Sequence, residues 1–339
     1  MPLLVSNRLN QHLKQEIFDK LQKECGNDNI CTQNERPQSS FGIGGAADII
    51  LRPDDEQELL ISLQVINSFN EDIPILTLGS GSNILISDCG VRGIIIHLGQ
   101  GFKKIELEGL TADVGAAAIL AKLTNESGHT GLSGLESTYG IPGTVGGALV
   151  MNAGTDRGSI GDLVEEITVI KRNGERLVHK KDCLVYEYRK SQFTGNTDAI
   201  LIGAKFGLTE GKAEDIMYKM NELRELRHSR QPYGCNTAGS TFKNFHGKAA
   251  QDLIKRDKSL RGSHHTTKDV VAAGKLIDIV ECKNLSVGKA RVSDLHANFI
   301  IAEKGASAQD ILDLINIIKT RVYDKFEHEL ELEIKLVGF

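Results

Sequence analysis

Tryptophan is absent from the 339 residues, and aromatic residues of all kinds make up only 5% of the chain. Proteins that bind single-stranded nucleic acids stack the bases on such rings, so this composition disfavours that class. The formal net charge of −5 also excludes an overall basic field that would attract nucleic acid or anionic membranes. We therefore expect no nucleic-acid partner.

Long apolar runs are missing as well. No stretch approaches the roughly 18 consecutive apolar residues that a membrane helix needs, and the first residues carry Lys14 and Glu16 among their apolar positions. We therefore expect a cytoplasmic protein with no segment that inserts into a membrane.

Cysteine pairs are missing too. The six cysteines are scattered, without a Cys-x-x-Cys pair and without the clustered His and Cys spacing of zinc sites. Neither a metal site nor a disulfide framework is indicated, and we expect reduced thiols.

Glycine is what the chain has in quantity, with 35 residues gathered partly in blocks. The first block, Gly79-Ser80-Gly81-Ser82-Asn83, follows a short apolar run that reads as a buried strand. Its backbone N–H groups are unshielded by side chains and could bind a phosphate or pyrophosphate. It is neither a Walker A loop nor a Gly-x-Gly-x-x-Gly fingerprint. Taken alone, it could equally be a tight connection between strands.

A second block runs through Gly140-Ile141-Pro142-Gly143-Thr144-Val145-Gly146-Gly147. Such a segment either lets the backbone approach a flat ligand or packs backbone against backbone. A third segment, Thr237 to Asn244, places Ser240 beside a glycine and ahead of Lys243, and its polar groups could bind phosphate or sugar. It contains no Gly-x-Ser-x-Gly elbow, so a serine hydrolase is unsupported.

Apolar spacing predicts the coarse organisation. Leu9, Leu13, Ile17 and Leu21 recur every four residues, which indicates an amphipathic N-terminal helix. Residues 167–170 and 176–178 flank Asn173-Gly174, a strong hairpin signal. A helix over 215–230 ends ahead of Pro232, and Ser307 with Asp310 predicts the capped start of another helix. A domain boundary falls near 210–215.

These blocks, in this order, make the chain resemble the UDP-N-acetylenolpyruvoylglucosamine reductase family, in its shorter subtype. The motifs that carry the resemblance are Phe41 to Ala47, Leu78 to Asn83, Gly134 to Glu136, Gly140 to Gly147, Met151 to Gly154, Tyr188 to Phe193, Gly239 to Asn244, Val292 to Ile300 and Leu332 to Ile334.

The resemblance implies an α+β protein with a vanillyl-alcohol-oxidase-type FAD-binding domain followed by a smaller α/β substrate-binding domain. We place a helical extension at 1–26, the FAD-binding domain at 27–210 and the substrate-binding domain at 211–339. An insertion near 245–271 carries many charges and is expected to be a surface loop.

The resemblance also implies the site. FAD would be bound non-covalently by Gly79, Ser80, Gly81, Ser82, Asn83, Ile141, Gly143, Thr144, Gly146 and Gly147. A UDP-sugar would contact Tyr188, Lys243, Asn244 and His296. No obligate protein partner is implied.

The family's reaction, a step of peptidoglycan precursor synthesis, passes hydride from NADPH through FAD to an enolpyruvyl ether. Arg189 would stabilise the charge that develops on the substrate carboxylate. Ser240 would protonate the carbanionic carbon, and Glu333 would assist as an acid or electrostatic partner.

Two alternatives remain open. The chain could be another flavin oxidoreductase of the same fold, such as a sugar or alcohol oxidase. It could also be a non-catalytic nucleotide-sugar-binding protein, because Ser39-Ser40 and Thr155-Asp156-Arg157 depart from the family's usual residues.

Overall fold

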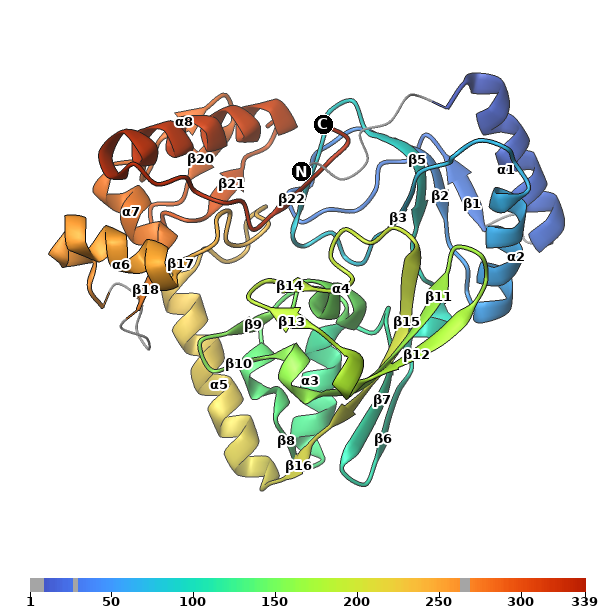
Figure 1. Cartoon of the computed structure of the whole chain (residues 1–339), viewed down its shortest axis with the longest axis horizontal. Helices are drawn as coiled ribbons and strands as arrows, with labels where there is room; N and C mark the ends of the chain where they lie inside the picture. Colours follow the sequence, from blue (N-terminus) through green and yellow to red (C-terminus); the bar gives the residue numbers. More distant parts are fainter. Residues whose placement is uncertain (1–8, 27–29, 263–268) are drawn as a thin grey trace.

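The computed structural model describes residues 9–26, 30–262 and 269–339, and Figure 1 shows its path. The predicted extension at 1–26 is therefore described from residue 9 onward. The α-helices of this part of the chain are α1 (Gln11–Cys25), α2 (Glu56–Asn67), α3 (Leu120–His129), α4 (Val145–Val150), α5 (Ala213–Arg230), α6 (Gly247–Arg256), α7 (Ala273–Ile279) and α8 (Ala308–Phe326).

The first sheet has the order β1 (Cys31–Gln33), β2 (Ala47–Leu51), β5 (Val91–Ile96) and β3 (Ile75–Thr77). Strands β2, β5 and β3 run parallel, β2 and nearly all of β5 are buried, and α1 and α2 pack against this sheet. The predicted N-terminal helix is confirmed, since Leu13, Ile17 and Leu21 of α1 are buried in the same cluster as the sheet. Asp55 caps α2 by accepting a hydrogen bond from the Glu58 N–H.

The second sheet is antiparallel, in the order β12 (Arg176–Lys180), β11 (Val164–Lys171), β15 (Ala199–Gly207), β7 (Thr111–Gly115) and β6 (Ile105–Glu108). The hairpin predicted around Asn173-Gly174 is the β11–β12 pair. Helices α3 and α4 pack on this sheet. Three short antiparallel pairs complete the region: β8 (Leu132–Ser133) with β16 (Thr209–Glu210), β9 (Gly154–Thr155) with β10 (Gly158–Ser159), and β13 (Tyr186–Glu187) with β14 (Lys190–Ser191).

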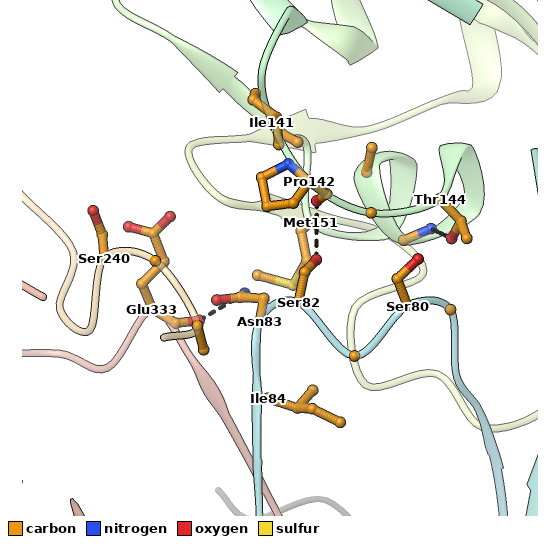
Figure 2. Close-up of a pocket in the computed structure, with 18 of the residues that line it drawn as sticks. Ser80, Ser82, Asn83, Ile84, Ile141, Pro142, Thr144, Met151, Ser240 and Glu333 are labelled. Carbon is orange, nitrogen blue, oxygen red and sulfur yellow. Dashed lines mark hydrogen bonds between the residues drawn. The ribbon is translucent and has the colours of Figure 1, made fainter. Parts of the chain in front are cut away.

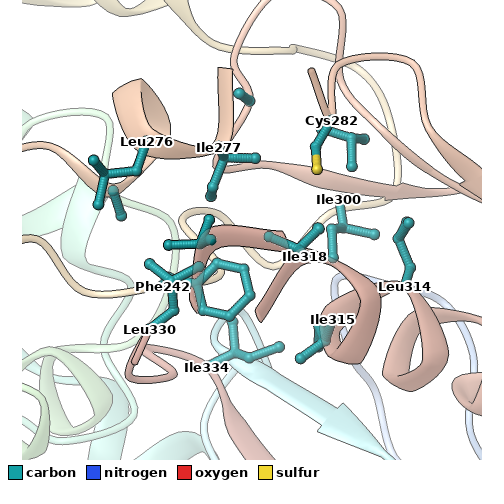
Figure 3. Close-up of a cluster of buried hydrophobic side chains, with 14 of the residues drawn as sticks. Phe242, Leu276, Ile277, Cys282, Ile300, Leu314, Ile315, Ile318, Leu330 and Ile334 are labelled. Atoms are coloured by element: carbon teal, nitrogen blue, oxygen red, sulfur yellow. The ribbon is translucent and has the colours of Figure 1, made fainter. Parts of the chain in front are cut away.

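Helix α5 leads into the C-terminal lobe, in which α7 and α8 pack with β19 (Ser286–Val287), β20 (Ala290–Val292) and β21 (Ile300–Ala302). Figure 3 shows the centre of this core, where Phe242 lies among aliphatic side chains of α7 and α8. The predicted capping box is confirmed: Ser307 Oγ accepts a hydrogen bond from the Asp310 N–H, and the Asp310 carboxylate accepts one from the Ser307 N–H.

The stretch 245–271 is not the charged surface loop that its composition predicts. Strands β17 (Phe245–His246) and β18 (Val270–Val271) pair at its base, and α6 lies between them. Ala250, Leu253 and Leu260 are fully buried in the C-terminal core. The prediction was wrong because the few apolar residues, spaced for one helix face, decide burial more than the surrounding charges do. His264 and His265 lie outside the described residues.

The end of the chain returns to the first domain. Strand β22 (Lys335–Val337) pairs in parallel with β4 (Ile84–Ile86), which directly follows the first glycine block. The Asp88 carboxylate accepts hydrogen bonds from the Ala308 and Gln309 N–H groups at 2.9 and 3.1 Å, so it caps α8 from the first domain. These contacts hold the C-terminal lobe against the glycine-rich loops. No helix within the described ranges is both long and apolar enough to cross a membrane.

Candidate active site

A cleft of about 2650 Å³ lies between the glycine-rich loops and the C-terminal lobe. With one exception, every residue predicted to bind or react lines it: Gly79, Ser80, Gly81, Ser82, Asn83, Ile141, Gly143, Thr144, Gly146, Gly147, Tyr188, Arg189, Ser240, Asn244, His296 and Glu333. The exception is Lys243, whose Nζ lies 2.5 Å from the carboxylate of Glu331 and outside the cleft lining.

The two glycine blocks pack against one another. A Cβ on Gly79 would lie 2.3 Å from Thr144 Oγ1, and Ser82 Oγ donates a hydrogen bond to the Pro142 carbonyl at 2.9 Å (Figure 2). Gly81 has a φ of +63°, and a Cβ there would lie 2.2 Å from the Gln38 carbonyl oxygen. Close packing, against the Thr144 side chain at Gly79 and against the Gln38 backbone at Gly81, therefore accounts for these two glycines.

The neighbouring glycines of α4 differ from each other. A Cβ on Gly146 would lie 3.0 Å from the Ala116 Cβ, so Gly146 is a packing glycine. Gly147 is exposed in the cleft, and the closest atom that its Cβ would meet is Thr144 Oγ1 at 3.4 Å. The bare backbone at Gly147 therefore faces space that a flat ligand can enter.

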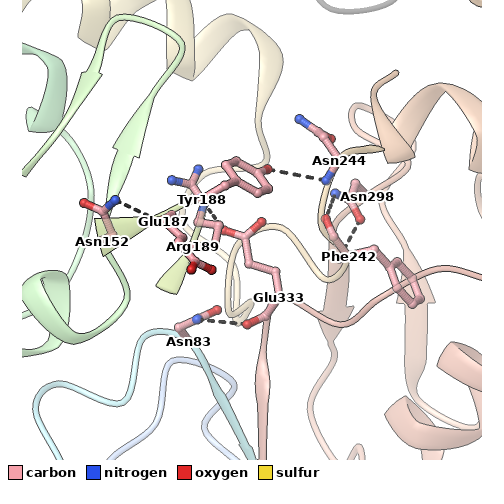
Figure 4. Close-up of polar contacts among 9 residues, drawn as sticks. All are labelled: Asn83, Asn152, Glu187, Tyr188, Arg189, Phe242, Asn244, Asn298 and Glu333. Atoms are coloured by element: carbon pink, nitrogen blue, oxygen red, sulfur yellow. Dashed lines mark hydrogen bonds and ion pairs between the residues drawn. The ribbon is translucent and has the colours of Figure 1, made fainter. Parts of the chain in front are cut away.

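Arg189 and Glu333 form an ion pair at the other side of the cleft (Figure 4). Arg189 lies between β13 and β14 with a φ of +56°, and Glu333 precedes β22. Arg189 Nε donates to Glu333 Oε1 at 2.7 Å, and the two side chains are 22% and 15% exposed. Burial raises the pKa of Glu333 above its ordinary value, while the positive charge of Arg189 opposes that rise.

Ser240 is connected to this ion pair through the backbone. The Glu333 N–H donates to the carbonyl of Thr241, the residue after Ser240, at 2.9 Å. The loop is fixed in turn by Asn298, whose side chain exchanges two hydrogen bonds with the backbone of Phe242. Figure 2 labels Ser240 and Glu333 among the residues that line the cleft.

Tyr188, Asn244 and His296 add polar groups around these residues. The Asn244 N–H donates to Tyr188 Oη at 3.4 Å, and burial raises the pKa of the Tyr188 hydroxyl. His296 Nδ1 accepts a hydrogen bond from the Asn298 N–H at 3.2 Å. Burial lowers the pKa of His296, so its imidazole is neutral at pH 7 and can contact an uncharged polar group.

Several cationic residues of the cleft were not predicted as site residues from the sequence, among them Lys335 and Arg227. Lys335 follows Glu333 by two positions, which the alternation of a strand could have indicated. Burial and the nearby Lys243 lower the pKa of Lys335. Arg227 lines the cleft from α5, and burial together with the charge of Arg189 lowers its pKa. The apolar spacing that predicts helix α5 does not indicate that Arg227 faces the cleft.

Acidic, histidine and cysteine side chains do not gather into a group of three or more that could hold a metal, as far as residues 9–26, 30–262 and 269–339 are concerned. None of the six cysteines forms a disulfide.

Comparisons with known proteins agree with this geometry. Residues 231–337 match the model of the UDP-N-acetylenolpyruvoylglucosamine reductase C-terminal domain, and residues 47–179 match an FAD binding domain. The UDP-N-acetylenolpyruvoylglucosamine reductase of Clostridium novyi (strain NT) is 35% identical over 326 residues, which are 96% of each chain. The chain belongs to this reductase family. The family's enzyme from Clostridioides difficile (strain 630) is 36% identical over 299 residues, covering 88% of this chain and 90% of that one.

A solved structure supports the same assignment. The reductase of this family from Thermus caldophilus superposes with a TM-score of 0.71 at 32% identity, covering 90% of this chain and 99% of that chain. The predicted family, the α+β fold with an FAD-binding domain, and the class of FAD-dependent oxidoreductase are confirmed.

The residues present in the cleft fit FAD. The exposed backbone at Gly147 and the Ser80 and Ser82 hydroxyls line one wall, and the charged and polar side chains of Arg189, Ser240 and Glu333 line the other. The cleft therefore has one glycine-rich wall and one wall that carries charged and polar side chains.

Proposed function

We propose that the protein reduces the enolpyruvyl ether of UDP-N-acetylglucosamine to UDP-N-acetylmuramate, with NADPH as the reductant, in peptidoglycan precursor synthesis. The observation that carries this proposal is the convergence of Arg189, Ser240 and Glu333 in one cleft with both glycine blocks. The names of the relatives that span most of the chain support the substrate.

The glycine-rich loops hold the cofactor in this proposal. Gly79 to Asn83 and Ile141 to Gly147 form the wall against which the FAD pyrophosphate and ring system lie. When bound there, FAD supplies the transfer of hydride from the reduced nicotinamide to the substrate. Because the two loops pack on each other through Thr144 and Ser82, they present one rigid surface.

Arg189 binds and orients the substrate carboxylate. A guanidinium stabilises the negative charge that spreads onto this carboxylate when hydride reaches the methylene carbon of the enolpyruvyl group. The 2.7 Å contact with Glu333 and the low exposure of the Arg189 side chain fix its direction before substrate arrives. Such preorganisation is worth more in a partly buried site than in water.

Ser240 and Glu333 handle the proton. The Ser240 hydroxyl donates a proton to the carbanionic carbon, which is basic enough to accept one from a hydroxyl that is correctly placed. The Glu333 backbone is hydrogen-bonded to Thr241, the residue after Ser240, and the raised pKa of Glu333 lets it hold a proton at a higher pH than an exposed carboxyl does. A protonated Glu333 can donate a hydrogen bond to the substrate carboxylate that Arg189 holds.

The UDP-sugar is held by the polar groups around the cleft. Tyr188, Asn244 and His296 contact it directly in this proposal. Lys243, which we expected in the same set, acts from outside the lining: its charge opposes the rise of the Glu333 pKa. Lys335 supplies a cation inside the cleft in its place.

The proposal is tested by incubating the FAD-loaded protein with NADPH and the enolpyruvyl UDP-sugar without oxygen. Beyond the one equivalent that reduces the bound FAD, NADPH should be consumed only when this substrate is present, and the product should contain two more hydrogens. A sugar or alcohol oxidase would instead be reduced by its sugar or alcohol and reoxidised by oxygen. A binding protein without flavin would bind the UDP-sugar and consume no NADPH.

A further inference from the structure

The backbone of Glu333 is held from two directions. Asn83 Nδ2 donates to the Glu333 carbonyl at 3.2 Å (Figures 2 and 4). The Lys335 N–H donates back to the Asn83 carbonyl at 2.9 Å. The Glu333 N–H donates to the Thr241 carbonyl at 2.9 Å. Since a carbonyl only accepts hydrogen bonds, the Asn83 side chain must direct its NH₂ group at Glu333. Asn83 thus joins the first glycine block to the carboxylate residue.

A second asparagine holds the backbone beside Arg189 in the same manner. Asn152 Nδ2 donates to the Glu187 carbonyl at 2.9 Å, and Asn152 Oδ1 accepts from the Gly161 N–H at 3.2 Å (Figure 4). The side chain is buried and its backbone has a φ of +44°, a region that asparagine tolerates better than most residues. Asn152 therefore fixes β13 two residues before Arg189.

The hairpin that carries Arg189 needs such support. Strands β13 and β14 have two residues each, too few to define the position of the turn between them. Arg189 itself has a left-handed backbone, which costs free energy unless the surroundings impose it. The ion pair with Glu333 forms only if both backbones are placed correctly, because both side chains are mostly buried.

From this geometry we propose that Asn83 and Asn152 are positioning residues, which set the Glu333 and Arg189 side chains relative to the two glycine-rich loops. The inference rests on the proposed function, in which those two side chains act on the substrate. Asn83 belongs to the first glycine-rich loop, and Asn152 follows α4, the helix that begins in the second. Each asparagine therefore connects the segment of one charged residue to the side of the cleft proposed for FAD. Their loss should therefore misplace the substrate groups while the FAD wall keeps its shape.

The variants Asn83→Ala and Asn152→Asp test this. Alanine removes the donor at 83, and aspartate at 152 keeps the acceptor for Gly161 and a tolerated backbone but loses the donor to Glu187. Asn67→Ala is the matched control, since Asn67 Nδ2 also donates to a distant backbone carbonyl, that of Arg172, and does not line the cleft.

Three quantities are measured for each variant: the rate at which NADPH reduces the bound flavin, the rate at which the enolpyruvyl substrate reoxidises it, and the affinity for FAD. We expect reoxidation of the reduced enzyme by the enolpyruvyl substrate to slow by about 10- to 100-fold in both variants, as for a misplaced reacting group. With FAD saturating, the rate of flavin reduction by NADPH should change less than about threefold in both variants. The FAD dissociation constant of the apoprotein, from fluorescence titration, should change less than about threefold in Asn152→Asp. Asn67→Ala should leave all three unchanged.

A double-variant cycle separates this inference from the proposed function. If Asn83 acts through Glu333, then Asn83→Ala should slow reoxidation by less than about threefold in a Glu333→Gln background. If the two substitutions slowed reoxidation by factors that multiply in full, the positioning role of Asn83 would be overturned. Normal reoxidation in Glu333→Gln alone would instead contradict the proposed function.

Discussion

The guanidinium of Arg189 and the carboxylate of Glu333 meet at 2.7 Å although 144 positions separate them in the sequence. Arg189 comes from a small hairpin of the first domain, and Glu333 comes from the segment by which the C-terminal lobe returns to β4. The reacting end of the cleft is therefore shared between the two parts of the chain. Neither part alone contains the pair.

The buried Glu333 predicts a specific pH dependence of stability. Burial raises its pKa in the native state above its ordinary value of 4.5, so the native protein binds this proton more tightly than the unfolded chain does. The resulting stabilisation is present below pH 4.5 and is lost as the pH rises through the native-state pKa.

We therefore expect the Tm of the wild-type apoprotein to fall relative to that of Glu333→Gln as the pH is raised from about 4.5 to 8. Calorimetry of both proteins over this range measures the difference. A Tm difference that is constant with pH, or that moves in favour of the wild type, would contradict the assigned direction of the pKa shift.

A substitution at Gly147 tests directly whether FAD binds against the glycine-rich side of the cleft. A valine there meets little protein but projects into the cleft, so the Tm of the apoprotein should stay the same while FAD binds about 10- to 100-fold more weakly. Fluorescence titration of the apoprotein with FAD measures the affinity. Unchanged affinity would place the cofactor elsewhere.

Gly81 serves as the contrasting position. A Cβ there would strike the Gln38 carbonyl within the protein itself, so Gly81→Ala should lower the Tm of the apoprotein. If Gly81→Ala also loses FAD, the cause would be distortion of the loop and not a clash between the new side chain and the cofactor. An apoprotein of unchanged Tm would show that the loop has more freedom than its packing indicates.

The stretch 245–271 yields a stability prediction. Truncating the fully buried Leu253 should cost about 2–5 kcal/mol of unfolding free energy in Leu253→Ala. Lys255 lies on the same helix, and its side chain is 75% exposed. Lys255→Ala should therefore lower the unfolding free energy by less than about 0.5 kcal/mol. Urea unfolding of both variants makes the comparison, and equal effects would mean that α6 does not contribute to the core.

Local features of the fold were predictable from the sequence because they depend on neighbouring residues. The capping box at Ser307 and the Asn173-Gly174 turn each contain their own hydrogen-bonding partners or backbone preference. The burial of α6 could not be predicted in this way, since Ala250 and Leu253 gain their partners only from the packed C-terminal lobe.

In the site, too, the sequence indicates individual residues but not the contacts between distant ones. The motif resemblance supplied Arg189, Ser240 and Glu333, but not their arrangement, which depends on the return of β22 to β4. Lys243 illustrates the limit: it belongs to the same motif as Ser240, yet the chain directs it to Glu331 outside the cleft. Asn152 was likewise invisible as a support for Arg189, because its partner Glu187 is 35 positions away.

The central claim is that Ser240 protonates the substrate after hydride transfer, and rapid mixing of Ser240→Ala tests it most directly. Flavin reduction by NADPH requires no proton from Ser240 and should proceed at nearly the wild-type rate. Reoxidation by the enolpyruvyl substrate should slow by about 10²–10⁴-fold, the usual contribution of a positioned acid. Ser240→Cys should retain part of the rate, because a thiol also donates a proton. If Ser240→Ala slowed both half-reactions equally, or neither, the hydroxyl would not be the acid.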